Sequence, residues 1–177
     1  MPPSVPPLTV QPVTPDARPA ALALRVHPEQ VRFSGEMPGL LEDAGADPHS
    51  LPMLVRLGEE GVGYFRLDFT PGAVAGRDFG QPSVGLRAFF IDRERQGQGL
   101  GTRAMSALSA WLREHRPGVR LLALSVNQRN SAARRAYEKA GFRVEGSLYL
   151  GGSAGPQDVM VLNLSRAEMG MEPQGRG

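Results

Sequence analysis

The segment over residues 95–102 has the composition of an anion-binding turn. It reads R-Q-G-Q-G-L-G-T, with three glycines among eight residues. An apolar run typical of a strand covers residues 84–91 before it, and apolar residues at helical spacing follow it over residues 100–115. A glycine-rich turn between a strand and a helix leaves backbone N–H groups without partners, and the helix N-terminus adds a partial positive charge. The sequence therefore predicts a phosphate-binding turn here.

Two common glycine motifs do not fit this turn. Counting from Gly97 and Gly99, Thr102 stands where the dinucleotide motif G-x-G-x-x-G has its third glycine. A P-loop ends in G-K-S or G-K-T, and no lysine follows these glycines. The spacing that does fit is Q-x-x-G-x-G, formed by Gln96, Gly99 and Gly101.

Two asparagines follow a second apolar run, which covers residues 120–126. Ligands of α/β sheets commonly bind at the carboxyl ends of strands, so Asn127 and Asn130 are candidate ligand contacts. Asn130 also stands where a helix over residues 131–140 would begin, and asparagine is a favoured helix N-cap. Both roles of Asn130 remain open at this point.

Length, composition and charge indicate one ordinary folded domain. The chain has 177 residues, of which 41% are hydrophobic and 21% charged, as in most folded proteins of this size. The net charge is +2, because 20 basic residues stand against 18 acidic ones that are mixed along most of the chain. This mixture argues against a nucleic-acid partner. The local exception is Arg129, Arg134 and Arg135, which suit either a phosphate contact or a solvated helix surface.

The chain contains no cysteine, which excludes disulfides, thiolate metal ligands and a cysteine nucleophile. His27, His49 and His115 lack the spacing of metal ligands, so no metal is expected. No apolar run approaches the ~20 residues that span a bilayer, and the start of the chain does not resemble a signal peptide. We therefore expect a cytoplasmic protein with no membrane partner.

Apolar periodicity predicts an α/β fold, a mixed sheet with helices on both faces. The strands over residues 84–91 and 120–126 should be parallel, because a helix separates them. The first of the two should be buried on both faces. A proline-rich lead over residues 1–7 and a tail over 166–177 are expected to be disordered or flexible around one domain, 8–165. The predicted strands cover residues 8–13, 53–57, 63–69, 84–91, 120–126, 142–150 and 159–164, and the predicted helices cover residues 15–26, 38–44, 100–115 and 131–140, with a turn over 28–33 and a long loop over 71–82.

In this combination the chain resembles the GNAT superfamily of acetyl-coenzyme A-dependent N-acetyltransferases. The resemblance rests on Q-x-x-G-x-G, on F-F-I-D before it, on S-V-N-Q-R-N-S-A-A-R-R-A-Y-E-K-A-G-F over residues 125–142, and on a closing V-M-V-L. The segments L-T-V-Q-P-V-T-P-D and H-P-E-Q-V-R-F more weakly resemble the spermine/spermidine-type acetyltransferases. The resemblance implies the GNAT fold, a mostly antiparallel sheet with one parallel strand pair that splays apart.

The resemblance also implies acetyl-coenzyme A as co-substrate and names residues that would hold it. Amides of the glycine turn would bind the pyrophosphate, and the edge of the strand before it would pair with the pantetheine arm. The Phe90 amide is the expected donor to the thioester oxygen, and the two asparagines are expected to contact the arm. The implied coenzyme-binding residues are Phe90, Ile91, Gln96, Gly97, Gln98, Gly99, Leu100, Gly101, Thr102, Asn127 and Asn130.

Tyr137 matches the general acid of the resembled family, in the context A-x-x-x-Y-x-x-x-G-F. A phenol has an ordinary pKa of about 10 and a thiol one of about 8.5, so a neutral tyrosine suits protonation of a departing thiolate. Tyr137 is the predicted catalytic residue. No base is assigned, because the nearby acids, Asp92, Glu94, Glu145 and Asp158, are each expected to be surface groups.

The function predicted from these residues is direct transfer of an acetyl group from acetyl-coenzyme A to a primary amine in a ternary complex. The alternative is a non-catalytic acyl-coenzyme A binding or sensor module. Asp158 stands where the resembled subgroup often carries a glutamate, so polyamines, aminoglycosides, amino acids and a protein N-terminus all remain open as acceptors. A homodimer also remains open.

Overall fold

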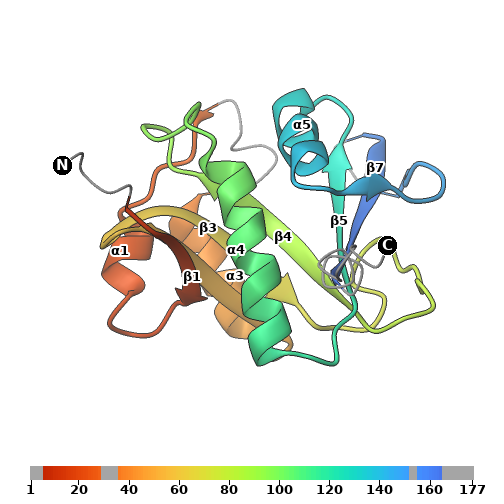
Figure 1. The fold of residues 1–177 in the computed structure, drawn as a ribbon, viewed down its shortest axis with the longest axis horizontal. Coiled ribbons are helices and arrows are strands. Elements are labelled where there is room, and N and C mark those ends of the chain that lie inside the picture. The colour runs from red at the N-terminus through yellow and green to blue at the C-terminus, as the bar shows by residue number, and fades with distance from the viewer. Residues whose placement is uncertain (1–5, 29–35, 152–154, 165–177) are drawn as a thin grey trace, which may run out of the picture.

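A mixed sheet of seven strands runs through the described part of the computed structural model, which comprises residues 6–28, 36–151 and 155–164 (Figure 1). Its strand order is β1-β2-β3-β4-β5-β7-β6. The elements are β1 (Leu8–Pro12), α1 (Arg18–Leu22), α3 (Met37–Ala46), β2 (Ser50–Leu57), β3 (Glu60–Asp68), β4 (Ser83–Ile91), α4 (Leu100–His115), β5 (Leu121–Asn127), α5 (Ser131–Lys139), β6 (Arg143–Val144) and β7 (Gln157–Asn163).

The order and direction of the strands confirm the predicted fold class. Strands β4 and β5 are parallel, and the other neighbouring strands of the sheet are antiparallel. The parallel pair arises because α4, 16 residues long, returns the chain to the starting edge. The sheet is therefore mostly antiparallel with one parallel pair at its centre.

The parallel pair is short, and the two strands diverge beyond it. The pairing joins Ser83 to Leu121, Val84 to Leu122 and Gly85 to Ala123. Strand β4 continues to Ile91 alongside β3, where the register shifts at a bulge. Ala88, at the bulge, has a φ of 55°, a conformation that side chains other than glycine rarely adopt. The second half of β4 thus leaves an edge that β5 does not cover.

Helices cover both faces of the sheet, as predicted (Figure 1). On one face, Met105, Leu108 and Leu112 of α4 pack with Phe65 and other sheet residues in the main core. These α4 residues are buried because they recur at the three- and four-residue spacing of one helix face. On the opposite face, α1 and α3 pack against β2, β3 and β4 in a second cluster that includes Tyr64. The sheet is thus the middle layer of three.

Apart from shifts of a few residues at the ends of other elements, three predictions differ from the structure. The first helix spans Arg18–Leu22 rather than 15–26, because Thr14 closes a separate turn in which its carbonyl accepts from Ala17 N at 2.9 Å. Strand β4 is not buried on both faces, since the bulge leaves Arg87 exposed. A continuous strand over 142–150 is also wrong, because Gly146 has a φ of 74° and ends the regular pairing.

Some predictions lie outside the described residues. They are residues 1–5 of the proline-rich lead, all but Pro28 of the turn over 28–33, and the tail over 166–177. Among the helices that are described, none has both the length and the apolar character needed to cross a bilayer.

Candidate active site

The predicted phosphate-binding turn has the backbone of an anion site. Gly97 has a φ of 80°, and Gly99, the N-cap of α4, has a φ of 75°. Glycine is favoured at both positions because side chains rarely adopt this positive φ. Crowding is not the reason, since an added Cβ at either position would meet no described atom within 4 Å. Gly101 differs, because it lies inside α4 and its Cβ would make an ordinary contact with Ala136 at 3.8 Å.

The N-terminus of α4 is open to a ligand. No side chain of the described residues caps it, because Gly99 stands at the N-cap. The first-turn N–H groups of a helix lack intrahelical partners, so they favour an anion together with the helix dipole. The Gln96 side chain secures the turn, since its Nε2 donates to the Ile91 carbonyl oxygen at 2.9 Å.

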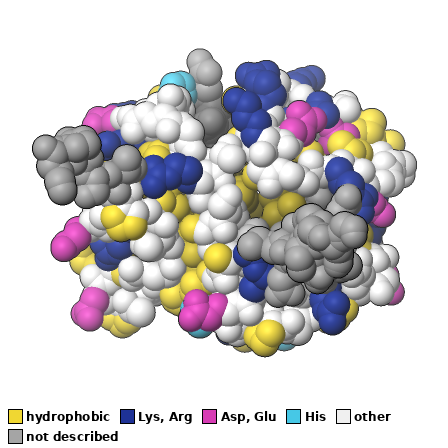
Figure 2. All heavy atoms as spheres, viewed as in Figure 1, with side chains coloured by type: hydrophobic (Ala, Val, Ile, Leu, Met, Phe, Trp, Pro, Cys, Tyr) yellow, Lys and Arg dark blue, Asp and Glu magenta, His cyan; other side chains and the backbone are white. Residues whose placement is uncertain are grey.

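A cavity of about 330 Å³, here called the turn cavity, lies between this helix N-terminus and α5. Of the predicted coenzyme-binding residues, Gln98 and Asn127 do not line it, and the other nine do. Arg135 and Lys139 of α5 line it as well, and basic side chains gather over α5 in Figure 2. Lys139 was not predicted, although its four-residue spacing from Arg135 is a usable signal. The full lining is Phe89, Phe90, Ile91, Arg95, Gln96, Gly97, Gly99, Leu100, Gly101, Thr102, Asn130, Ala132, Ala133, Arg135, Ala136 and Lys139.

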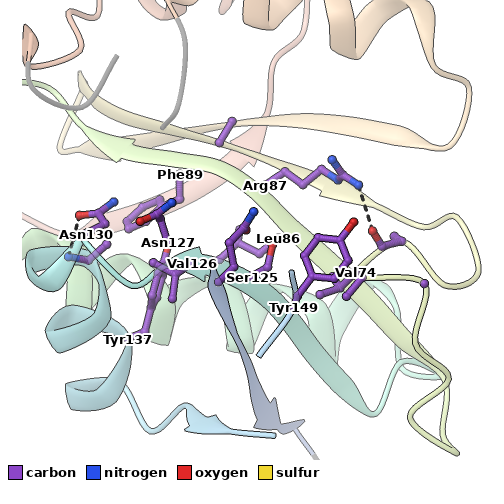
Figure 3. Close-up of a pocket in the computed structure, with 16 residues that line it drawn as sticks. Val74, Leu86, Arg87, Phe89, Ser125, Val126, Asn127, Asn130, Tyr137 and Tyr149 are labelled. Atoms are coloured by element: carbon purple, nitrogen blue, oxygen red, sulfur yellow. Dashed lines mark hydrogen bonds between the residues drawn. The ribbon is translucent and has the colours of Figure 1, made fainter. Parts of the chain in front are cut away.

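A second cavity of about 420 Å³, here called the gap cavity, lies where β4 and β5 diverge (Figure 3). It adjoins the turn cavity, because Phe89, Asn130 and Ala133 line both. Figure 3 shows Tyr137, Asn127, Asn130 and Phe89 toward one end, and Arg87 and Tyr149 toward the other. Its lining is Ala73, Val74, Ala75, Gly76, Leu86, Arg87, Ala88, Phe89, Ser125, Val126, Asn127, Asn130, Ala133, Tyr137, Tyr149 and Gln157.

The register of β4 decides which backbone groups face the gap. Asp92 N donates to the Val62 carbonyl oxygen at 2.7 Å, so Val62 and Asp92 form a hydrogen-bonded pair of the β3–β4 ladder. Such pairs alternate with non-bonded pairs. The amide of Phe90, opposite Tyr64, therefore faces β3, whereas the N–H and C=O of Ile91 face the open side. The Gln96 bond to the Ile91 carbonyl agrees with this direction. The Phe90 N–H, the expected donor, therefore points away from the gap, and the Ile91 N–H is the one directed to its open side.

Tyr137 is held by aromatic packing and has a free hydroxyl. Its ring centroid lies 6.1 Å from that of Phe89 and 5.4 Å from that of Phe142. The side chain lines the gap cavity, and its hydroxyl makes no hydrogen bond to any described residue. Burial raises the pKa of Tyr137 above that of an ordinary phenol, so the group stays neutral over the physiological range.

The two asparagines both lie at the gap cavity. The Oδ1 of Asn130 accepts from Ala133 N at 3.3 Å, so this residue caps α5 and also borders both cavities. The Oδ1 of Asn127 accepts from Arg129 N at 2.9 Å, which shapes the turn before α5. The two roles left open for Asn130 are therefore compatible.

Helix α5 is tied to β7 by an ion pair. Arg134 Nε lies 3.2 Å from Asp158 Oδ2, and the Asp158 side chain is 10% exposed. Asp158 is therefore not the surface acid that was expected, because the β5–β7 pairing buries it beneath α5. Arg134 is likewise engaged in this ion pair, so Arg135 is the member of the predicted basic patch that reaches the turn cavity.

None of the acids considered as a base lines either cavity. Asp92 accepts from the backbone N–H groups of Arg25 and Glu94, at 2.7 and 3.0 Å. Glu94 pairs with Arg25 at 3.2 Å, and Glu145 pairs with Arg143 at 2.9 Å. These three carboxylates are therefore engaged by other groups of the fold, outside both cavities.

Comparison with known proteins agrees with this geometry. The sequence pattern of the acetyltransferase (GNAT) family matches residues 19–142. The chain belongs to this family and is therefore an acyltransferase by class, as its sequence predicted.

Two relatives from Bacillus subtilis each share 31% identity over 157 residues, which is 89% of this chain and 99% of the relative. They are the spermine/spermidine N(1)-acetyltransferase of strain 168 and the probable spermine N(1)-acetyltransferase of subspecies natto strain BEST195. The predicted likeness to this subgroup is confirmed.

Solved structures share the fold at lower identity. An aminoglycoside N(6')acetyltransferase from Legionella pneumophila superposes with a TM-score of 0.71 at 16% identity, covering 92% of this chain and 95% of the other. A spermidine N-acetyltransferase from Vibrio cholerae, in complex with coenzyme A and spermine, has a TM-score of 0.65 at 18% identity, with 89% and 96% covered. The predicted GNAT fold is confirmed by these likenesses.

Proposed function

We propose that this protein transfers an acetyl group from acetyl-coenzyme A to a primary amine by direct attack in a ternary complex. The observation that carries the proposal is the pair of adjoining cavities, one beside an uncapped helix N-terminus and the other lined by a neutral tyrosine. The names of the relatives support an amine acceptor, and the Vibrio cholerae structure contains coenzyme A.

The turn cavity is proposed to hold the pyrophosphate end of the coenzyme. Backbone N–H groups of the glycine turn and of the first turn of α4 would donate to the phosphate oxygens. Arg135 and Lys139 would add positive charge from the α5 side. The unpaired edge of β4 then leads from this cavity to the gap cavity, along Ile91 and Phe89, and an extended amide chain can pair with such an edge.

The chemistry is proposed to occur where the two cavities meet. The Ile91 N–H would stabilise the oxyanion as the amine nitrogen bonds to the thioester carbon, which is typically worth about 10²–10³ in rate. As the carbon–sulfur bond breaks, Tyr137 would give its proton to the sulfur and recover one from solvent. Before it attacks, the ammonium group of the acceptor would lose a proton to water and become a neutral amine, since no carboxylate among the described lining residues can accept that proton.

A thiol-release assay over a panel of amines tests the proposal, with calorimetry of acetyl-coenzyme A binding alongside. We expect binding of the coenzyme and release of one thiol for each amine acetylated. Binding without acetylation of any amine would refute the enzymatic proposal and favour the sensor module.

A further inference from the structure

The gap cavity has an unusual charge for a site that accepts an amine. Arg87 is the one side chain with a full charge among its described lining residues, and no carboxylate is among them. A polyamine carries several positive charges and needs acids to balance them. Arg87 would oppose such an acceptor instead of attracting it.

We infer that the acceptor amine carries a carboxylate group, as an amino acid does, and that the Arg87 guanidinium binds it. This inference rests on the proposed function, because it specifies the acceptor of the same site. A planar guanidinium matches a carboxylate better than any other side chain does, through two parallel N–H···O bonds.

The guanidinium of Arg87 is held in place but retains free donors. Its Nε lies 3.0 Å from Asp68 Oδ2, and its Nη2 donates to the Ala73 carbonyl oxygen at 2.9 Å, the contact drawn in Figure 3. Its Nη1 has no partner among the described residues, and 48% of the side chain is exposed. A group fixed by two partners loses little side-chain entropy when it binds a ligand.

The acids beside Arg87 lie outside the cavity. Asp68 is buried, with 6% of its side chain exposed, and it also accepts from Thr70 N at 3.0 Å. It contacts Arg66 at 3.9 Å, and Arg66 in turn lies 3.8 Å from Asp47. Neither aspartate lines the gap cavity, so a ligand there would meet the guanidinium edge rather than a carboxylate.

The position of Arg87 in the cavity suits a group attached near the reacting amine. In Figure 3 Arg87 and Tyr149 lie toward the end of the cavity away from Tyr137 and Asn130. The amine would approach Tyr137 from this end while Arg87 holds the carboxylate, which fixes the orientation of the acceptor. The alternative is that Arg87 only supports the loop over residues 71–82 through Ala73, and the test below separates the two roles.

The experiment compares acceptors that differ only in the carboxylate. Tyrosine is assayed against tyramine and arginine against agmatine, with the amino acid amides as uncharged controls. We expect kcat/KM to be about tenfold or more higher for the member with the carboxylate, the usual scale of a charged hydrogen bond. In Arg87→Gln the ratio of the two kcat/KM values within each pair should fall toward one, mainly because KM rises for the member with the carboxylate. Arg87→Lys should restore part of this ratio.

Arg66→Gln is the matched control, because Arg66 faces Arg87 across the β3–β4 ladder, contacts Asp68 as well, and does not line the cavity. Its ratio should stay at the wild-type value, while thermal unfolding of both variants reports any damage to the fold. Equal rates within each pair, or equal loss of the ratio in both variants, would overturn the inference. If amines without a carboxylate are acetylated best, the inference fails and the proposed function stands; if no amine is acetylated, both fail.

Discussion

Replacement of Tyr137 by phenylalanine separates proton donation from packing. The variant keeps the ring, whose centroid lies 6.1 Å from Phe89 and 5.4 Å from Phe142. The lost hydroxyl has no hydrogen-bond partner among the described residues, so no buried group is left unpaired. The free energy of unfolding should therefore change by less than about 1 kcal/mol.

The expected effect on catalysis is much larger. General acids typically contribute about 10²–10⁴ to the rate, and we expect kcat to fall about 100-fold in Tyr137→Phe, or about 2.7 kcal/mol in the barrier. Calorimetry should give a Kd for acetyl-coenzyme A within about twofold of the wild type, because the hydroxyl acts on the departing sulfur.

The control is Tyr64→Phe, which removes another buried hydroxyl from a residue that lines neither cavity. Thiol release should be unchanged in this variant. Because burial raises the pKa of Tyr137, the wild-type kcat should show no alkaline loss near pH 10, where an ordinary phenol ionises. Wild-type turnover by a folded Tyr137→Phe enzyme would refute the assigned proton donor.

Four substitutions test the buried Tyr64 hydroxyl, the glycine turn and the ion pair of α5. Burial raises the pKa of Tyr64 to about 12, so above pH ~10 this residue alone should lower the stability of the wild type by about 1.4 kcal/mol for each pH unit toward 12, in addition to the loss from buried Tyr137. Tyr64→Phe should remove only the Tyr64 share of that loss in denaturant titrations and, since the hydroxyl has no partner among the described residues, stabilise the fold by about 1 kcal/mol. Gly99→Ala should cost about 1–2 kcal/mol because its φ is 75°, and should weaken coenzyme binding; Gly101→Ala, where the Cβ has room, should be neutral or stabilising. Asp158→Asn should destabilise the fold by about 1–3 kcal/mol in thermal unfolding and lower kcat by loosening α5, and an unchanged melting temperature would contradict the role of its pair with Arg134.

Much of the fold could be predicted because local signals agree with it. The apolar positions of α4 repeat at helical spacing, and glycine and asparagine mark the starts of α4 and α5. The sequence over residues 142–150 contains no local signal strong enough to predict that this strand is interrupted. There, Arg77 donates to the carbonyl oxygens of Glu145 and Ser147, at 2.9 and 2.5 Å, and this contact joins segments far apart in the chain.

The candidate site could be predicted only where motifs mark it. The glycine turn and Tyr137 stand in recognisable patterns, but the burial of Asp158 and the position of Arg87 depend on which strands are neighbours. The direction of the Phe90 and Ile91 amides depends on ladder register, which shifts at the bulge near Ala88. Composition and spacing carry no information on that shift.

The short pairing of β4 with β5 divides the sheet into two blocks that meet along a seam of three residue pairs. A ligand that contacts both blocks would hold them together. At a free concentration of 100 times its Kd, it would add about 2.7 kcal/mol to the free energy of unfolding. Hydrogen exchange can follow this amide by amide. The Phe90 N–H, directed into β3, should be protected in the free protein, whereas the Ile91 N–H should gain protection when acetyl-coenzyme A binds. The boundary between β4 and β5 would thus be the least stable part of the sheet in the free protein and the part that bound substrate makes rigid.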